Sequence, residues 1–303
     1  MSSKRTVDHG ELAAESAAGA LRTAGSQVGL PTDGAQLIRL GSNAVFRLPG
    51  NVIARVARSA EMLENAQKQV DVAGWLEAEH FPAVRALNVR QPIVAEHRVV
   101  TFWRSESDEE VYAPIGDVAD LIRRLHALVE PKDIQLPSLR PFGMPDDPLP
   151  DFSALSRDDA EYLRGRVADA RRMFDSLDYE LPRGVVHGDA NVGNVIMADD
   201  GGPVLIDLDS FSIGPREWDL IQNAIFYDRF GWHSADEYEI FVRVYGYDIM
   251  GWSGYPDLAD MREVAMTAWL SRQAVNSNKS AAEVAKRIST MRTGASRRDW
   301  SAY

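Results

Sequence analysis

One segment, residues 184–219, constrains the fold and the chemistry of this chain more than any other. Within it, His187-Gly188-Asp189 is followed five positions later by Asn194, and Asp207 lies thirteen positions beyond Asn194. Three apolar residues precede His187, and four more precede Asp207. Short apolar runs of this kind are typical of buried strands. We therefore expect two buried strands to carry Asp189, Asn194 and Asp207 to one edge of a sheet.

The oxygen-bearing side chains of this segment suit one kind of reaction. Asp189 can accept a proton from a hydroxyl, whereas Asn194 and Asp207 can hold a hard cation such as magnesium, which takes few protein ligands and shares substrate phosphates. An Asp, an Asn five positions later and a metal-binding Asp on the next strand form the phosphoryl-transfer site of protein kinases. Either Asp alone would more often be a turn or cap residue. The joint pattern favours the site.

Composition excludes several other classes of function. The chain has 303 residues, no cysteine and a formal net charge of −12. Without cysteine there is no disulfide, no thiolate nucleophile and no Cys-ligated zinc. The acidic balance argues against a nucleic-acid partner, which requires a basic face. The sequence shows no apolar stretch of membrane-spanning length and no signal-peptide core, so we expect a cytoplasmic enzyme with no membrane partner.

The first part of the chain predicts a small antiparallel sheet. Residues 1–34 suggest an N-terminal extension that forms a loose helix or a tail. Short β-like runs at 36–40, 44–48 and 52–57 are separated by turn residues, and two further strands are expected at 86–89 and 98–103. One helix, at about 60–78, lies between the third and fourth strands. These elements predict a five-stranded lobe over residues 35–104.

The remainder, residues 105–303, predicts a larger and mainly helical lobe. Helical patterns occupy about 117–128, 158–175, 218–227, 236–245, 257–271 and 281–292, with a proline-rich connector at 137–150. The 184–219 segment inserts short strands among these helices. The expected fold class is α+β with two lobes.

At this point the chain resembles the aminoglycoside phosphotransferase family, which also includes choline-kinase-like enzymes. The HGDxxxxN signature of that family is present at 187–194, the metal-binding Asp stands in Ile206-Asp207-Leu208-Asp209, and residues 214–220 resemble the family's GPxxWDL segment. The resemblance implies a bilobal protein-kinase-like fold with ATP bound between the lobes. It also implies transfer of the γ-phosphate to a hydroxyl of a small polar metabolite or antibiotic.

The resemblance implies a role for each matching residue. Asp189 would orient the acceptor hydroxyl and accept its proton, and Asn194 and Asp207 would bind Mg²⁺. His187 and Asp219 would support the catalytic loop. The remaining matching positions concern the nucleotide: Ser42 and Asn43 would touch phosphate, whereas Trp103 and Ser105 would meet adenine through the main chain. Main-chain contacts leave GTP open as an alternative to ATP.

Two positions depart from the family pattern. The third strand offers Arg55 where the family has the Lys that grips the α- and β-phosphates, and Arg does not simply replace Lys. Counting back six residues from Trp75 gives Gln69 where the family has a Glu that pairs with this Lys. A neutral Gln cannot form that ion pair. Glu61 and Glu64, one or two turns earlier, are alternatives if the register differs.

Two other functions therefore stay open. The departures at Arg55 and Gln69 fit a nucleotide-binding pseudokinase without turnover. The same machinery could also phosphorylate Ser or Thr hydroxyls in a peptide. The residues expected to select the acceptor, about 130–160 and 225–303, contain no motif that identifies it, and the oligomeric state is equally undetermined.

Overall fold

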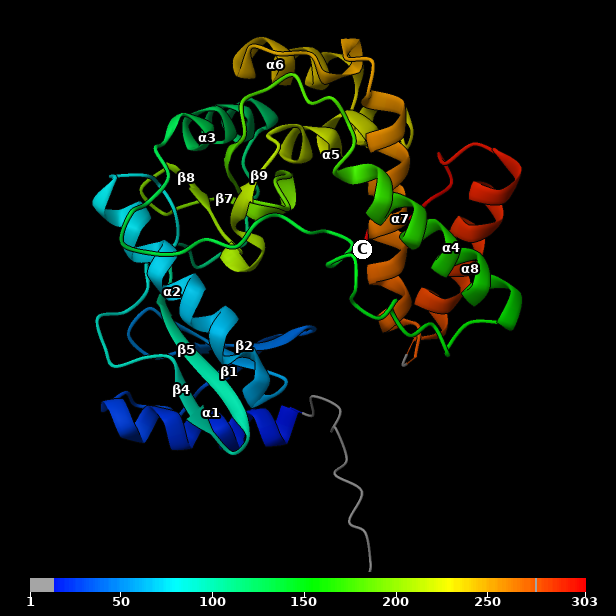
Figure 1. The fold of residues 1–303 in the computed structure, drawn as a ribbon. Coiled ribbons are helices and arrows are strands. Elements are labelled where there is room, and N and C mark those ends of the chain that lie inside the picture. The colour runs from blue at the N-terminus through cyan, green and yellow to red at the C-terminus, as the bar shows by residue number, and fades with distance from the viewer. Residues whose placement is uncertain (1–13, 276) are drawn as a thin grey trace, which may run out of the picture. The chain divides into compact units, whose positions relative to one another are not determined.

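The computed structural model describes residues 14–275 and 277–303, which form two compact units (Figure 1). The first, called the sheet unit, comprises the described residues up to Ala113 together with Pro131–Leu136 and Gly193–Ser210. The second, called the helical unit, comprises Pro114–Glu130, Pro137–Val192 and Phe211–Tyr303. Residues 35–104, where the sequence predicts strands, all fall in the sheet unit. Residues 1–13 of the expected N-terminal extension lie outside the described residues.

The sheet unit contains a five-stranded antiparallel sheet in the order β1-β2-β3-β5-β4. Its side chains alternate between buried and partly exposed positions along β2 and most of β3, so one face of the sheet is more deeply buried than the other. The strands are β1 (Gln36–Leu40), β2 (Asn43–Leu48), β3 (Val52–Ala57), β4 (Ile93–Ala95) and β5 (Arg98–Arg104). The prediction of five antiparallel strands is confirmed.

The position of one strand was predicted wrongly. The expected strand at 86–89 is absent from this described region, where Ala86 makes only an isolated bridge to Trp103, and β4 takes the place beside β5. The side chain of Gln91 explains the difference. Its amide nitrogen donates to the Phe102 carbonyl at 3.1 Å, and its oxygen accepts from the Phe102 N–H at 2.7 Å. The Leu87 N–H still donates to the Phe102 carbonyl at 2.9 Å, but the Phe102 N–H is taken by the Gln91 side chain, so the pairing of this segment with β5 does not continue as a strand.

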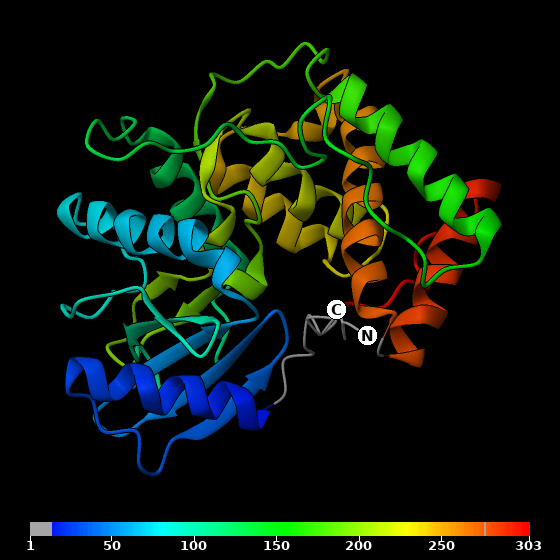
Figure 2. The same ribbon diagram turned by 60° about the horizontal axis from the view of Figure 1, so that its bottom comes forward.

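Helices cover both faces of the sheet, as Figure 2 shows. Helix α1 (Ala14–Val28) buries Ala17, Ala20 and Leu21 in one core with the inward residues of β2 and β3. The expectation of a loose helix or tail is therefore wrong for this segment, because its small apolar residues pack directly on the sheet. Helix α2 (Leu63–Ala78), which follows the 3₁₀ turn η1 (Ala60–Met62), packs on the other face through Ala66.

The sheet unit also contains a short hairpin from the 184–219 segment. Strands β7 (Val195–Met197) and β8 (Pro203–Leu205) pair antiparallel, with Val195 opposite Leu205. The hairpin is flanked by the 3₁₀ turns η2 (Val192–Asn194) and η3 (Leu208–Ser210). Asn194 and Asp207 therefore both lie at the open end of the hairpin, before β7 and after β8.

The helical unit contains all six helices that the sequence predicts after residue 105, with ends within three residues of the prediction. Helix α7 packs against α4, α5 and α8, and α3 packs against α6 (Figure 1). Their bounds are α3 (Ile115–Ala127), α4 (Arg157–Phe174), α5 (Glu217–Asp228), α6 (Ala235–Tyr245), α7 (Tyr255–Gln273) and α8 (Asn278–Thr293). A further 3₁₀ turn, η4 (Ile249–Gly251), lies between α6 and α7.

Serine side chains accept backbone N–H groups at the starts of α4, α6 and α8, which explains why these helices begin where they do. Strand β6 (Gly184–Val186) pairs with β9 (Ser212–Gly214). Within the described ranges, no helix combines the length and apolar character that a membrane span needs.

Candidate active site

The loop His187-Gly188-Asp189 leaves β6 in a conformation fixed by one buried carboxylate. The two oxygens of Asp219 accept the N–H groups of His187 at 2.7 Å and Gly188 at 2.8 Å. Gly188 has a φ of +85°, a backbone conformation that glycine adopts without strain. Asp219 is fully buried in α5, so the loop is held from inside the helical unit.

Other residues of the same unit complete this support. The Trp218 indole donates to the Gly188 carbonyl at 2.9 Å, and the Asn223 amide donates to the Ala190 carbonyl at 3.1 Å. Both donors come from α5, which places the 214–220 segment directly beneath the loop. The expected supporting role of Asp219 thus has a contact that can provide it, and His187, which is fully buried beside it, packs its ring edge-on against Phe211.

Opposing effects set the charge state of Asp219. Burial by itself would raise the pKa of Asp219, but a hydrogen bond with His126, the electrostatic influence of His126 and His187 and the hydrogen bond from the His187 N–H together lower that pKa below its usual value. His126 Nε2 lies 3.1 Å from Asp219 Oδ2, and its Nδ1 lies 2.8 Å from the Tyr245 hydroxyl. A carboxylate that stays ionised in a buried position can keep accepting both loop N–H groups.

Asp189 itself remains accessible. Its side chain is 44% exposed, whereas the neighbouring His187 and Asp219 are fully buried. Its Oδ1 accepts a 2.6 Å charge-assisted hydrogen bond from Arg262 of α7. Arg262 was not anticipated, because one sequence offers no signal that separates it from arginines on the outer faces of other helices. The loop therefore presents an oriented carboxylate on the surface of the helical unit.

The two expected metal ligands belong to the sheet unit, at one end of the β7–β8 hairpin. The Ile206 N–H donates to the Asn194 carbonyl at 2.9 Å, so Asn194 lies opposite the residue that precedes Asp207. Asp207 has a φ of +61°, a region that residues other than glycine seldom adopt. Strain of this kind is commonly kept at functional sites. An amide and a carboxylate together supply the hard oxygen donors that fit Mg²⁺.

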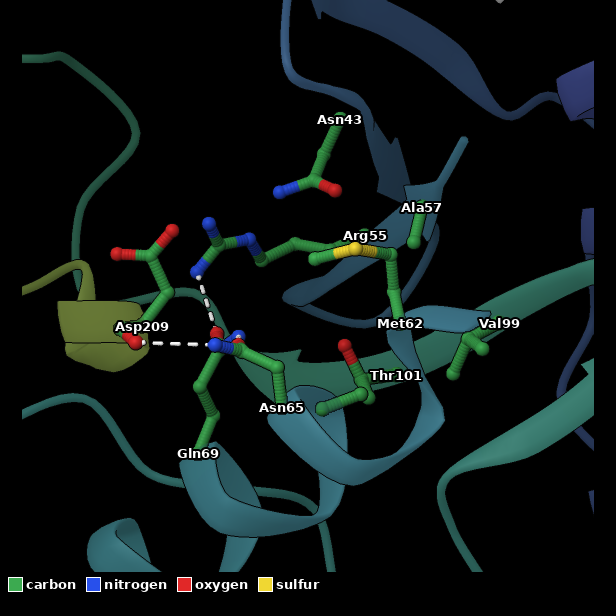
Figure 3. A pocket seen from close by; sticks show the side chains of 10 residues that line it. Asn43, Arg55, Ala57, Met62, Asn65, Gln69, Val99, Thr101 and Asp209 are labelled. Carbon is green, nitrogen blue, oxygen red and sulfur yellow. Dashed lines mark hydrogen bonds between the residues drawn. The ribbon is translucent and has the colours of Figure 1, made fainter. Parts of the chain in front are cut away.

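Arg55 of β3 connects the sheet to this hairpin. Its Nη2 lies 2.8 Å from Asp207 Oδ1. Its Nη1 donates to Gln69 Oε1 at 3.2 Å (Figure 3). The structure therefore brings Gln69 to Arg55, whereas Glu61 and Glu64 are exposed on their turns of the chain. The residue expected to hold phosphate is paired with a residue expected to hold the metal.

A small hollow surrounds Arg55 within the sheet unit. Asn43, Gln69 and Thr101 are among its lining residues, and its volume of about 30 Å³ is enough for a water molecule or two (Figure 3). Its floor is held from α2, because Asn65 and Lys68 both donate to the Asp209 carbonyl, at 3.1 Å and 2.5 Å. Burial lowers the pKa of Lys68, while the charge of Asp209 opposes that change.

The other residues expected to meet a nucleotide occupy two strand ends. Ser42 lies in the exposed β1–β2 turn directly before Asn43. Trp103 is buried in β5, where its indole donates to Thr101 at 2.9 Å. The Ser105 N–H, directly after β5, donates to the Asn51 carbonyl at 2.8 Å.

Comparisons with solved structures find the same fold in several kinases. Amicoumacin kinase hAmiN, solved in complex with AMP-PNP, Ca²⁺ and Ami, has a TM-score of 0.68 at 11% identity, covering 93% of this chain and 94% of that chain. The microcompartment-associated aminopropanol kinase has a TM-score of 0.65 at 15% identity, covering 89% and 94%. Aminoglycoside phosphotransferase APH(3'')-Id from Streptomyces rimosus has a TM-score of 0.58 at 20% identity, covering 81% and 96%. At these identities the likeness establishes the fold.

The family follows from the sequence. No curated protein matches the chain. The model of the phosphotransferase enzyme family matches residues 36–264, which is most of the chain and includes the loop, the hairpin and the 214–220 segment. The fold is the α+β, kinase-like fold that the resemblance implied. The chain therefore belongs to the phosphotransferase enzyme family.

Proposed function

We propose that this enzyme transfers the γ-phosphate of ATP, with Mg²⁺, to a hydroxyl of a small polar metabolite or antibiotic. The observation that carries the proposal is that the Asp189 carboxylate is accessible while Asp219, which supports its loop, is buried. A buried Asp219 fixes the loop through two N–H groups, and the Asp189 carboxylate next to them stays accessible. A positioned carboxylate can orient an acceptor hydroxyl and take up its proton as the oxygen–phosphorus bond forms.

The donors at the hairpin end support a magnesium requirement. Asn194 and Asp207 would hold the ion, leaving its remaining positions for phosphate oxygens and water. Bound magnesium would neutralise charge on the transferring phosphoryl group. Phosphoryl transfer leaves little covalent work for the protein, so the contribution of these residues is to position and to balance charge.

Arg55 and the β1–β2 turn supply the proposed phosphate contacts. The guanidinium of Arg55 is a forked donor that suits phosphate oxygens. Ser42 and Asn43 would contribute polar groups from the turn, and the main chain at Trp103 and Ser105 would meet the base. GTP remains an alternative donor because such contacts do not read the base through side chains.

The proposed class of acceptor rests on proteins that share this fold. Structural relatives include an amicoumacin kinase and an aminopropanol kinase, whose names describe small molecules as substrates. We extend to this chain only the shared feature, a small polar acceptor. A kinase for Ser or Thr hydroxyls of a peptide is not favoured by any observation in the described residues.

Two measurements test the proposal. Calorimetric titration of ATP with and without Mg²⁺ into the wild type should give magnesium-dependent binding, and Asp207→Asn should abolish that dependence. Phosphate transfer from labelled ATP, screened over pooled polar metabolites and antibiotics, should disappear in Asp189→Ala. Transfer that survives Asp189→Ala would remove Asp189 from the mechanism.

One observation favours a second candidate, a nucleotide-binding protein without turnover. Arg55 forms an ion pair with Asp207. Gln69 is neutral, so its hydrogen bond with Arg55 provides no charge that could compete with Asp207 for the guanidinium. If this contact blocks turnover, the wild type should be inactive and the double variant Arg55→Lys with Gln69→Glu should gain activity. Turnover by the wild type would dismiss this candidate.

A further inference from the structure

The Asp189 carboxylate is held by a residue outside the segment that carries the phosphotransferase motifs. Arg262 lies in α7, more than seventy positions later in the chain, and is only 6% exposed. Its Nη2 donates to Asp189 Oδ1 at 2.6 Å, and its Nη1 lies 3.5 Å from the Gly188 carbonyl. One guanidinium group therefore contacts both the reactive carboxylate and the backbone that bears it.

Arg262 is itself fixed in place by α5. Its guanidinium carbon lies 4.7 Å from the centroid of the Trp218 ring, and Nη2 also donates to Gln222 Oε1. Trp218 in turn donates to the Gly188 carbonyl at 2.9 Å. Stacking on an indole face and bonding in a planar fork restrict a guanidinium to one orientation. The orientation of Asp189 is thereby tied to two helices.

We infer that Arg262 is a positioning residue for phosphoryl transfer: it fixes the plane of the Asp189 carboxylate in front of the acceptor hydroxyl. The inference rests on the proposed function for its catalytic meaning. Arg262 exchanges no proton and acts through Asp189. Each of the two N–H groups on Nη2 has an acceptor, Asp189 and Gln222, so the fork joins the loop to α5.

A lysine could not perform the same task. Its ammonium would keep the positive charge but would have no planar fork to stack on Trp218 while it bonds Asp189 and Gln222. If Arg262 served only to hold α7 against α5, its contacts with Trp218 and Gln222 would be sufficient, and the 2.6 Å contact with Asp189 would not be needed. These two differences separate a positioning role from a general stabilising role.

The chain offers a matched control. Arg292 of α8 also lies 4.7 Å from an aromatic centroid, that of Tyr162, and also pairs with a carboxylate, Asp159, at 2.8 Å. Among its contacts within residues 14–275 and 277–303, none involves the catalytic loop, and in this it differs from Arg262. Arg262→Met and Arg292→Met therefore each remove an ion pair and a contact with an aromatic ring. Only Arg262→Met removes an ion pair with the catalytic carboxylate.

The first readout does not depend on turnover. Carboxylates of the folded full-length protein are labelled with a carbodiimide and glycine ethyl ester, and the rate at each site is measured by peptide mass spectrometry. We expect Arg262→Met and Arg262→Lys to raise labelling of Asp189 several-fold while labelling of Asp228 and Asp260 stays constant. Arg292→Met should leave Asp189 at the wild-type rate.

The second readout uses hydrolysis of MgATP, with water as the acceptor. Displacing a catalytic group by about 1 Å can cost about 100-fold in rate, so Arg262→Met should lower kcat by about that factor at an unchanged KM for MgATP. Arg262→Lys should remain closer to the methionine variant than to the wild type. Arg292→Met should keep the kcat of the wild type.

The outcomes separate this inference from the proposed function. Unchanged labelling of Asp189 in both Arg262 variants overturns the positioning role, and so does increased labelling with an unaltered kcat. A wild type that does not hydrolyse MgATP and transfers no phosphate contradicts the proposed function instead. In that case, the labelling rates still decide whether Arg262 holds Asp189.

Discussion

Arg55 Nη2 and Asp207 Oδ1 form an ion pair 2.8 Å long between the third strand of the sheet and the end of the β7–β8 hairpin. The two residues have different expected ligands, phosphate for Arg55 and magnesium for Asp207. A cation that binds Asp207 therefore competes with a guanidinium for the same carboxylate. Because Gln69 is neutral, it shares a hydrogen bond with Arg55 but exerts no net charge to draw it aside.

Gln69→Glu should change this competition. The added carboxylate would attract Arg55 and weaken its contact with Asp207, so we expect ATP to bind more tightly in the presence of Mg²⁺, by about tenfold or about 1.4 kcal/mol. Calorimetric titration of MgATP measures the change. The same substitution on the exposed surface of α1, Gln27→Glu, is the control for added negative charge. Equal affinities of Gln69→Glu and wild type would show that Arg55 does not limit metal binding.

Asp219→Asn should weaken the catalytic loop. The variant keeps one acceptor oxygen but loses the charge that holds two N–H groups, and leaves His126 without its carboxylate, so we expect about 2 kcal/mol lower stability in denaturant unfolding. Phosphate transfer should fall by about 100-fold because the loop is displaced. Asp228→Asn, a change at the other end of α5, should leave transfer unaltered. Full transfer activity in Asp219→Asn would mean that the loop is held without it.

The contribution of Asp219 should also depend on pH. Because its pKa is lowered in the folded state, its stabilising effect is complete above the ordinary value of 3.8 and is lost as the pH falls through the lower folded value. Wild type and Asp219→Asn should therefore converge in unfolding free energy as the pH is lowered below about 3.8. A stability difference that is constant from pH 7 to pH 3 would contradict this account.

The ionised carboxylate of Glu217 should have the opposite effect on stability from that of Asp219. Burial raises the pKa of Glu217, and its Oε2 has no hydrogen-bond partner among the described residues, although Oε1 accepts from the Leu181 N–H at 2.7 Å. The ionised carboxylate therefore costs stability above the ordinary value of 4.5 and does not do so below it. Glu217→Gln should raise the thermal midpoint at pH 7 and match the wild type near pH 4. A lower midpoint at pH 7 would show that the charge is needed.

Leu21→Ala tests whether α1 is part of the folded core. Leu21 is only 1% exposed against the sheet, so the substitution should cost about 3 kcal/mol of unfolding free energy. Arg22→Ala, next to it but exposed, should change stability by less than about 0.5 kcal/mol. Urea unfolding of the two variants distinguishes a packed helix from a dispensable extension.

Local patterns predicted most of the elements. The alternation of burial along β2 and β3 follows from one face of the sheet being more deeply buried than the other. The six helices of the helical unit follow from apolar spacing, with serine caps at several starts. The failures occurred where a side chain competes with the backbone or where small residues do the packing. Gln91 ended one expected strand by bonding Phe102, and Ala17 and Ala20 of α1 are too weakly hydrophobic in sequence to reveal a buried face.

The sequence by itself determined the family and the candidate groups, because Asp189, Asn194 and Asp207 stand at the spacings of the family's motifs. It could not determine the partners of those groups. Asp189 meets Arg262, and Asp207 meets Arg55, across 73 and 152 positions of the chain. Such contacts depend on how helices and strands pack, and a single sequence records only the residues, not the neighbours that packing brings to them.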